Sequence, residues 1–155
     1  MMGHRIYLAS SWRNRYQPQL VETLRQRDHE VYDFRHPVPG NEGFRWSQID
    51  PGWESWKVFQ YRQALNHPLA VQGYRYDVEA LIAAEVVVLL LPSGRSAHTE
   101  AAWHRGRGGV VIVHSPEPCE PELMYKLFNW ITAEDAELVQ LLDLDLKQLQ
   151  NLRLD

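Results

Sequence analysis

The amino-acid sequence predicts a single α/β domain built on a doubly wound, five-stranded parallel sheet. Short apolar segments that suit strands alternate with segments whose apolar residues recur at helical spacing. Residues 86–91 form a continuous run of Val and Leu, which is typical of a central parallel strand covered on both faces. The length of 155 residues suits one domain with its own core, which we expect to span residues 1–155.

The chain opens with a predicted β-α-β unit. Residues 5–10 are mostly apolar and end in small residues, which favours a buried strand. Residues 17–26 carry apolar side chains at helical spacing, and residues 29–34 alternate Val31 and Phe34 with polar residues. Strand, helix and strand are therefore expected in that order.

Residues 35–73 form a long insertion that is broken by Pro and Gly and rich in aromatic residues. Three of the six tryptophans lie in it: Trp46, Trp53 and Trp56. Insertions of this length are usually functional lids or interfaces. We expect an aromatic lid with one or two short helices, in which a ring such as Trp46 stacks on a ligand. The same rings would also suit a core or a subunit interface.

The second half continues the alternation of helices and strands. We expect helices at residues 76–84, 97–105, 120–125 and 133–146, and strands at residues 86–91, 110–113 and 128–132. Thr132 is the expected cap of the last helix, and the leucines that follow either extend that helix or pack against a partner subunit. This order predicts a Rossmann-like or flavodoxin-like sheet, whose ligand crevice lies at the carboxyl ends of the strands.

Composition and charge exclude several classes of protein. A net charge of −4 argues against a polymeric nucleic acid as partner. No apolar run approaches the roughly 20 residues that cross a membrane. The single cysteine, Cys119, cannot form an internal disulfide, which favours a reducing compartment. We therefore expect a cytoplasmic protein without a membrane partner.

The segment Ser93-Gly94-Arg95-Ser96 lies between a predicted strand and a predicted helix. Its hydroxyls, glycine and guanidinium suit a cradle for a phosphate or a sugar, because a helix N-terminus attracts anions. The segment also suits an ordinary turn in which Ser96 caps the helix. Neither a Walker loop nor a dinucleotide-binding glycine motif is present.

Two carboxylates, Asp77 and Glu100, lie on elements that border the expected crevice. Converging carboxylates suit the cleavage of a glycosidic bond, although each residue also reads as an ordinary helix acid. His98-Thr99-Glu100 has the H-x-E form of zinc deaminases. In those enzymes a Pro-Cys-x-x-Cys segment supplies two further zinc ligands. Here Pro118-Cys119 is present, but Glu122 occupies the position of the second cysteine, so we expect no metal and no cofactor.

Three segments together resemble the nucleoside 2-deoxyribosyltransferase superfamily, which includes the deoxynucleoside 5′-monophosphate N-glycosidases. The first is Ile6-Tyr-Leu-Ala-Ser-Ser-Trp12, an opening strand and small-residue turn. The second is residues 77–88, in which Asp77 lies eight residues before Glu85, the acidic residue that directly precedes the predicted strand. The third is Ser93-Gly-Arg-Ser-Ala-His-Thr-Glu100-Ala-Ala-Trp103, a turn and helix that carry the glutamate.

The resemblance implies a role for each matching residue. Glu100 would be the nucleophile that forms a covalent glycosyl-enzyme, Tyr7 would position it, and Asp77 would assist departure of the base. The remaining expected substrate-binding residues are Ser10, Trp12, Arg13, Ser93, Gly94, Arg95, Ser96 and His98, in addition to Trp46.

The expected partner is a small nucleoside or nucleoside 5′-monophosphate, whose N-glycosidic bond is cleaved or transferred. Exchange of bases by deoxyribosyl transfer is an alternative within this class. A nucleotide sensor without turnover, and an interaction protein that uses its Trp-rich insertion, are alternatives from other classes. We also expect a homodimer or a larger homo-oligomer.

Overall fold

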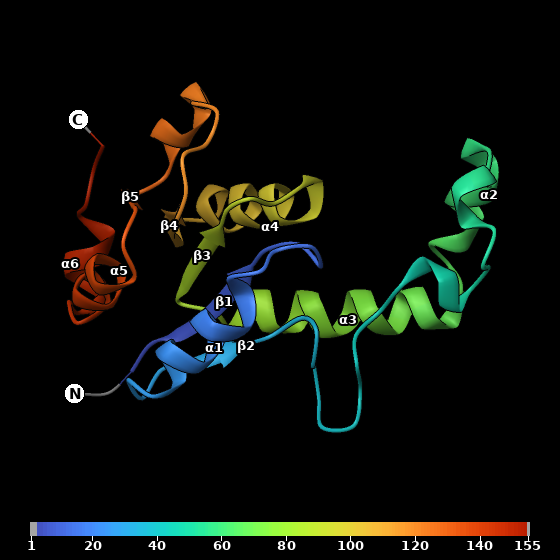
Figure 1. Ribbon diagram of the computed structural model, residues 1–155, viewed down its shortest axis with the longest axis horizontal. Helices are drawn as coiled ribbons and strands as arrows, with labels where there is room; N and C mark the ends of the chain where they lie inside the picture. The colour runs from blue at the N-terminus through green and yellow to red at the C-terminus, as the bar shows by residue number, and fades with distance from the viewer. Residues whose placement is uncertain (1–2, 155) are drawn as a thin grey trace. The chain divides into compact units, whose positions relative to one another are not determined.

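The computed structural model describes residues 3–154 and contains one five-stranded sheet (Figure 1). All pairings are parallel, in the order β2-β1-β3-β4-β5. The strands are β1 (Arg5–Ala9), β2 (Glu30–Tyr32), β3 (Val86–Leu90), β4 (Val110–His114) and β5 (Trp130–Thr132). The predicted α/β class and five-stranded parallel sheet are confirmed.

The strand order has a switch point between β1 and β3. Ile6 of β1 pairs with Val31 of β2 on one side and with Val86 of β3 on the other. The connection after β1 leads to β2 on one side of it, and the connection after β2 leads to β3 on the other side. In sheets of this kind the crevice outside the carboxyl ends of the two diverging strands is where ligands bind.

Alternation along the strands separates two apolar layers. Ile6 and Leu8 belong to the main core, to which α1 (Gln17–Arg25), α5 (Asp135–Leu142) and α6 (Leu146–Gln150) contribute leucines. Neighbouring residues of a strand face opposite sides, so Tyr7 faces the other layer. That layer holds α4 (Arg95–Gly106), which contacts β1, β3 and β4.

Small residues bring α4 close to the sheet. Ala97 and Ala101, one turn apart on the helix, are both fully buried. Without larger side chains at these two positions, the helix backbone can lie near the strands, and the first turns of α4 border the carboxyl ends of β1 and β3. This placement is what brings residue 100 near the end of β1.

The predicted helix over residues 133–146 is wrong in its extent. Two short helices, α5 and α6, occupy this region. Asp145 begins α6 as its cap: Gln148 N–H donates to Asp145 Oδ1 at 2.8 Å, and Asp145 N–H donates to Gln148 Oε1 at 2.9 Å. Thr132 does not cap α5, whose N-cap is Glu134; the Thr132 hydroxyl instead lies 2.7 Å from His114 Nδ1. Leu144, Leu146, Leu149 and Leu152 pack on the main core.

The described chain packs as two compact units. One contains the sheet and runs to Asp33 and again from Leu81, and the other is Phe34–Ala80. The second unit contains the short 3₁₀ helices η1 (Trp46–Gln48) and η2 (Trp53–Ser55), the helix α2 (Val58–Ala64) and most of α3 (Pro68–Ala83). It covers the predicted insertion of residues 35–73 and extends beyond it.

Helix α3 begins earlier than its predicted start at residue 76. Pro68 is tolerated because it stands at the first helical position, where its missing N–H has no helical partner to lose. Gly73, which reads as a break in the sequence, lies inside the helix. A Cβ atom there would come within 2.9 Å of Phe44 Cβ, so close packing explains the glycine.

Among residues 3–154, no helix combines the length and the apolar character that crossing a membrane requires.

Candidate active site

A tyrosine and a glutamate meet at the switch point of the sheet. Tyr7 lies on β1, is 1% exposed and faces α4. Its hydroxyl donates a hydrogen bond to Oε2 of Glu100, which lies in the second turn of α4 and is half-buried. The pairing expected from the sequence between these two residues is thus present, and it fixes one carboxylate oxygen.

The tyrosine ring is itself supported from β2. Tyr32 stacks on Tyr7 with ring centroids 5.1 Å apart and an angle of 25° between the planes. The next residue, Asp33, is buried and accepts a hydrogen bond of 2.7 Å from Gln17 Nε2 of α1. These contacts hold the carboxyl end of β2 beside β1. Tyr32 escapes sequence reasoning because only the parallel register places it level with Tyr7.

The loop after β1 is hydrogen-bonded to the chain that leaves β3. Ser10 Oγ donates to the Leu90 carbonyl at 3.1 Å, and Asn14 Nδ2 donates to the Pro92 carbonyl at 3.0 Å. Both polar residues are buried. Ser10 therefore uses its hydroxyl for the architecture of the crevice, whereas Trp12 and Arg13 of the same loop are exposed. Asn14 stands just beyond the segment that the sequence singled out.

The Ser93–Ser96 segment forms the turn between β3 and α4. The N-cap of α4 is Gly94, with no side-chain hydrogen bond, so the alternative in which Ser96 caps the helix is wrong. Arg95 and Ser96 are exposed in the first turn of the helix. Ser93 Oγ is buried without a hydrogen-bond partner, an arrangement that is uncommon for a buried hydroxyl.

His98 is engaged through both ring nitrogens. Nδ1 lies 2.8 Å from the Gly94 carbonyl oxygen, and Nε2 lies 2.7 Å from the Tyr125 hydroxyl. Tyr125 comes from η3 (Leu123–Leu127), a short 3₁₀ helix between β4 and β5. Sequence reasoning missed Tyr125, since no local pattern connects residue 125 to residue 98.

Polar side chains from two loops flank the same edge of the sheet. The Tyr16 hydroxyl and Arg15 Nη2 donate to Oε2 of Glu117, at 2.7 and 3.2 Å respectively. Glu117 follows β4, and Tyr16 precedes α1. Because β3 lies between β1 and β4, this contact joins the loop after β1 to the loop after β4, on either side of the carboxyl end of β3.

Two further expected site residues belong to the second unit, residues 34–80. Asp77 lies in α3 and is half-buried. Trp46 is the centre of an aromatic cluster within that unit, with Phe44, Trp56 and Tyr61 at centroid distances of 4.9, 5.9 and 5.9 Å in edge-to-face contact. The rings of the insertion thus contact one another within the second unit while each remains partly exposed.

The described residues do not assemble a metal centre. Within residues 3–154 no group of three or more His, Cys, Asp or Glu side chains has an arrangement that could hold a metal ion. Cys119, which the zinc-deaminase alternative would need, is exposed in a loop.

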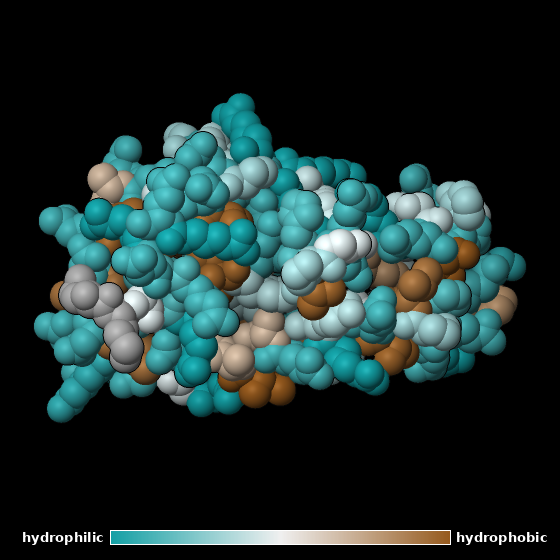
Figure 2. Space-filling view, turned by 90° about the horizontal axis from the view of Figure 1, so that it is seen from below, coloured by the Kyte–Doolittle hydropathy of each residue, from teal (hydrophilic) through white to brown (hydrophobic). Residues whose placement is uncertain are grey.

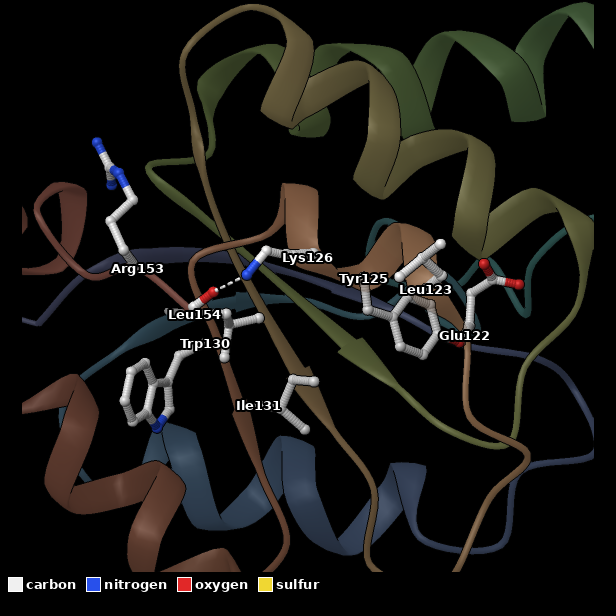
Figure 3. A pocket seen from close by; sticks show the side chains of 8 residues that line it. All are labelled: Glu122, Leu123, Tyr125, Lys126, Trp130, Ile131, Arg153 and Leu154. Carbon is white, nitrogen blue, oxygen red and sulfur yellow. Dashed lines mark hydrogen bonds between the residues drawn. The ribbon is translucent and has the colours of Figure 1, made fainter.

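An open pocket of about 590 Å³ lies beside β5 and η3 (Figure 3). Its lining residues are Glu122, Leu123, Tyr125, Lys126, Trp130, Ile131, Arg153 and Leu154. The ammonium of Lys126 already donates to the Leu154 carbonyl at 2.9 Å, and the Arg153 guanidinium donates to the carbonyls of Gln150 and Leu152. None of the expected site residues lines this pocket.

Solved structures of other proteins share this fold. The 2-deoxyribosyltransferase of the psychrotolerant bacterium Bacillus psychrosaccharolyticus is 17% identical, with a TM-score of 0.62 over 93% of this chain and 94% of that one. The CMP N-glycosidase BcmB of Clostridium botulinum is 17% identical, with a TM-score of 0.50 over 90% and 98%. A conserved protein of Enterococcus faecalis V583 is 15% identical, with a TM-score of 0.52 over 96% and 99%.

The chain is therefore an α/β protein with the fold of a 2-deoxyribosyltransferase and of a CMP N-glycosidase. The fold that the resemblance to the nucleoside 2-deoxyribosyltransferase superfamily implies is the fold that is present. No protein-family model and no curated protein matches the sequence.

Proposed function

We propose that this protein cleaves or transfers the N-glycosidic bond of a nucleoside or a nucleoside 5′-monophosphate, with Glu100 as the nucleophile. The observation that carries the proposal is the hydrogen bond from the buried Tyr7 hydroxyl to the Glu100 carboxylate at the β1–β3 switch point. The shared fold supports it, because the proteins described above act on CMP or transfer 2-deoxyribosyl groups.

The proposed chemistry follows from how the charge moves. As the bond from C1′ to the base nitrogen breaks, its electron pair leaves with the base and positive charge builds on the sugar. A carboxylate oxygen of Glu100 stabilises that charge and then bonds to C1′, which gives a glycosyl ester. The hydrogen bond from Tyr7 to one carboxylate oxygen holds the Glu100 side chain in place for this attack. Attack of water on C1′ returns the free carboxylate and releases the sugar.

The remaining residues have proposed roles around this step. Asp77 donates a proton or a hydrogen bond to the departing base, which lowers the barrier to its departure. The turn of Ser93, Gly94, Arg95 and Ser96 binds the sugar or its 5′-phosphate at the N-terminus of α4. The unpartnered hydroxyl of Ser93 supports this role, because a ligand oxygen would satisfy it.

The aromatic and first-loop residues complete the proposal. Trp12 and Arg13 are exposed in the loop after β1, where a ligand could reach them. Trp46 stacks on the base and excludes water. Transfer to a second base is the alternative outcome of the same intermediate, and the acceptor that captures the sugar decides between them.

The first test is a search for base release. The wild-type protein is incubated with a panel of ribonucleosides, deoxyribonucleosides and their 5′-monophosphates, with and without a second free base, and the products are separated by chromatography. We expect a free base from at least one compound, or a new nucleoside if transfer occurs. Tight binding of one compound without any product would instead support a sensor.

The second test addresses Glu100 directly. Glu100→Gln keeps the shape of the side chain and removes the nucleophile, so we expect the rate to fall at least about a thousandfold while the thermal unfolding temperature is kept. Mass spectrometry of quenched wild-type protein should detect a glycosyl adduct that the variant lacks. Glu120→Gln, at an exposed loop position, is the matched control and should retain full rate. Full activity of Glu100→Gln would contradict the mechanism.

A further inference from the structure

A hydrogen-bonded chain runs from η3 to the first turn of α4. It starts at the Tyr125 hydroxyl, passes through the imidazole of His98 and ends at the carbonyl oxygen of Gly94. The two contacts measure 2.7 and 2.8 Å, which are short distances for good hydrogen bonds. Residues 27 positions apart in the sequence are thereby linked at the turn proposed to bind substrate.

The direction of each bond follows from the chemistry of the groups. A backbone carbonyl oxygen only accepts, so Nδ1 of His98 carries a proton and donates it to Gly94. In the neutral imidazole the other nitrogen then has a free lone pair, so Nε2 accepts from the Tyr125 hydroxyl. Both nitrogens are used, and His98 in this arrangement has none left for a ligand.

Aromatic packing holds the donor in place. The Tyr125 ring lies against His98 at a centroid distance of 5.7 Å and against Phe128 at 5.9 Å, both in stacked geometry. Phe128 is itself buried. Burial, with smaller contributions from Cys119 and Glu122, raises the pKa of Tyr125, so its hydroxyl keeps its proton and remains a donor at neutral pH.

The hydrogen-bonded chain ends at the carbonyl of Gly94, the N-cap of α4. Gly94 has no side chain, and no other group lies within 4 Å of the place that a Cβ would occupy. Its carbonyl receives a backbone bond of 3.3 Å from His98 N and the side-chain bond from Nδ1 of the same residue. The orientation of the Gly94–Arg95 peptide therefore depends on His98.

We propose that Tyr125 and His98 are positioning residues, which hold the Ser93–Ser96 turn in the orientation that binds the sugar or 5′-phosphate of the substrate. This proposal rests on the proposed function for its ligand and on the Tyr125–His98–Gly94 chain for its geometry. It assigns η3, which follows β4 and contributes nothing to the proposed chemistry, a part in substrate binding.

Kinetics on the nucleotide that the wild type cleaves fastest give the first readout. Tyr125→Phe keeps the stacked ring and removes one neutral hydrogen bond, so we expect KM to rise about five- to tenfold with kcat within about twofold. The catalytic rate is kept because the Tyr7–Glu100 contact is untouched. Tyr74→Phe, which removes a hydroxyl from an exposed tyrosine, is the matched control and should behave as the wild type.

Substitutions of His98 separate the two bonds. In His98→Asn the amide can still donate to Gly94 from near the position of Nδ1, but it has no counterpart of Nε2. We expect its KM to match that of Tyr125→Phe, and the double variant to show no further rise, because both remove the same link. His98→Ala removes both bonds and should raise KM further.

A measurement without substrate keeps the inference independent of the reaction. Nitrogen-15 NMR of the imidazole should detect His98 with the proton on Nδ1, and Tyr125→Phe should shift the Nε2 signal. Exchange of the backbone amide at residue 98 should accelerate in His98→Ala, because the Gly94 carbonyl that accepts this N–H loses its side-chain hydrogen bond.

The possible results separate the two proposals. If no compound of the panel reacts, the proposed reaction fails, and the NMR and exchange measurements still test the positioning of the turn. A proton on Nε2 in the wild type, or a Tyr125→Phe variant with unchanged KM and unchanged His98 signals, would overturn the inference.

Discussion

Two histidines at the amino end of the sheet depend on the protonation of one ring. His4 N donates to His29 Nδ1 at 3.0 Å, and the two buried rings stack with centroids 5.6 Å apart. His4 Nε2 also lies 2.8 Å from the Leu144 carbonyl, so the pair ties the start of β1 to the C-terminal segment. Nδ1 of His29 can accept this bond only while it carries no proton.

The free energy of unfolding should therefore decrease at acid pH. Burial lowers the pKa of His29, assisted by His4 and Arg27 and opposed by Asp143 and Asp28. The unfolded chain takes up the proton first, at a pKa of about 6.5. The contribution of neutral His29 is complete above that value and is lost as pH falls toward the lower pKa of the folded state.

Urea unfolding at pH 7.5 and pH 5.5 measures this effect. In His29→Asn, the side-chain oxygen replaces Nδ1 as acceptor and does not titrate, so we expect a smaller loss of unfolding free energy at pH 5.5 than in the wild type. His67→Asn is the matched control, because His67 Nδ1 also accepts a backbone N–H, from Leu69 at 3.1 Å, in a more exposed place. Equal acid losses in the wild type and His29→Asn would contradict the assignment.

At the scale of elements, close packing overrides local propensity in α3. Gly73 is unfavourable inside a helix, yet the side chain of Phe44 fills the space that a larger residue would need. The glycine therefore marks a contact between α3 and residue 44 of the same unit, where a reading by local pattern finds a break.

Gly73→Ala tests this explanation. The clash with Phe44 should cost about 1–3 kcal/mol, which outweighs the gain of about 0.5–1 kcal/mol in helix propensity. We expect a lower urea midpoint than in the wild type. Gly106→Ala in α4, where nothing lies within 4 Å, is the control and should be neutral or stabilising. A stabilised Gly73→Ala would show that Phe44 moves aside without cost.

At the scale of the whole molecule, apolar side chains remain exposed in both units, and Figure 2 shows such surface among the polar atoms of one face. In α2 of the second unit, Val58 is 81% and Phe59 is 52% exposed. In η3 of the first unit, Leu123 is 81% and Leu127 is 57% exposed. Contiguous exposed apolar surface commonly marks an interface, and Val58 and Phe59 are adjacent in α2.

We therefore keep the expectation of a homodimer or a larger homo-oligomer. Sedimentation equilibrium at micromolar concentration should give a mass of at least twice 18.1 kDa. The double variant Val58→Glu/Phe59→Glu should dissociate if α2 lies in the interface. Gln63→Glu/Gln72→Glu, which adds the same charge at exposed polar positions, is its control. A wild type that sediments as a monomer at 100 µM would contradict the expectation.

The site divides between what local pattern reveals and what it conceals. Glu100 and the Ser93–Ser96 turn follow a recognisable strand, so the switch-point rule locates them. Tyr32 and Tyr125 lie at positions without any distinctive local pattern. They join the site only because β2 lies beside β1 and η3 returns to the start of α4.

The sequence by itself determined the class of fold, the five parallel strands and the edge at which chemistry is expected. It does so because strand burial and helical spacing are local patterns that the solvent imposes on each element. The tertiary structure decided partners that no local pattern indicates: Tyr32 with Tyr7, His98 with Tyr125, and Ser10 with a backbone carbonyl. Such contacts depend on strand register and helix approach, which arise only when distant segments pack together.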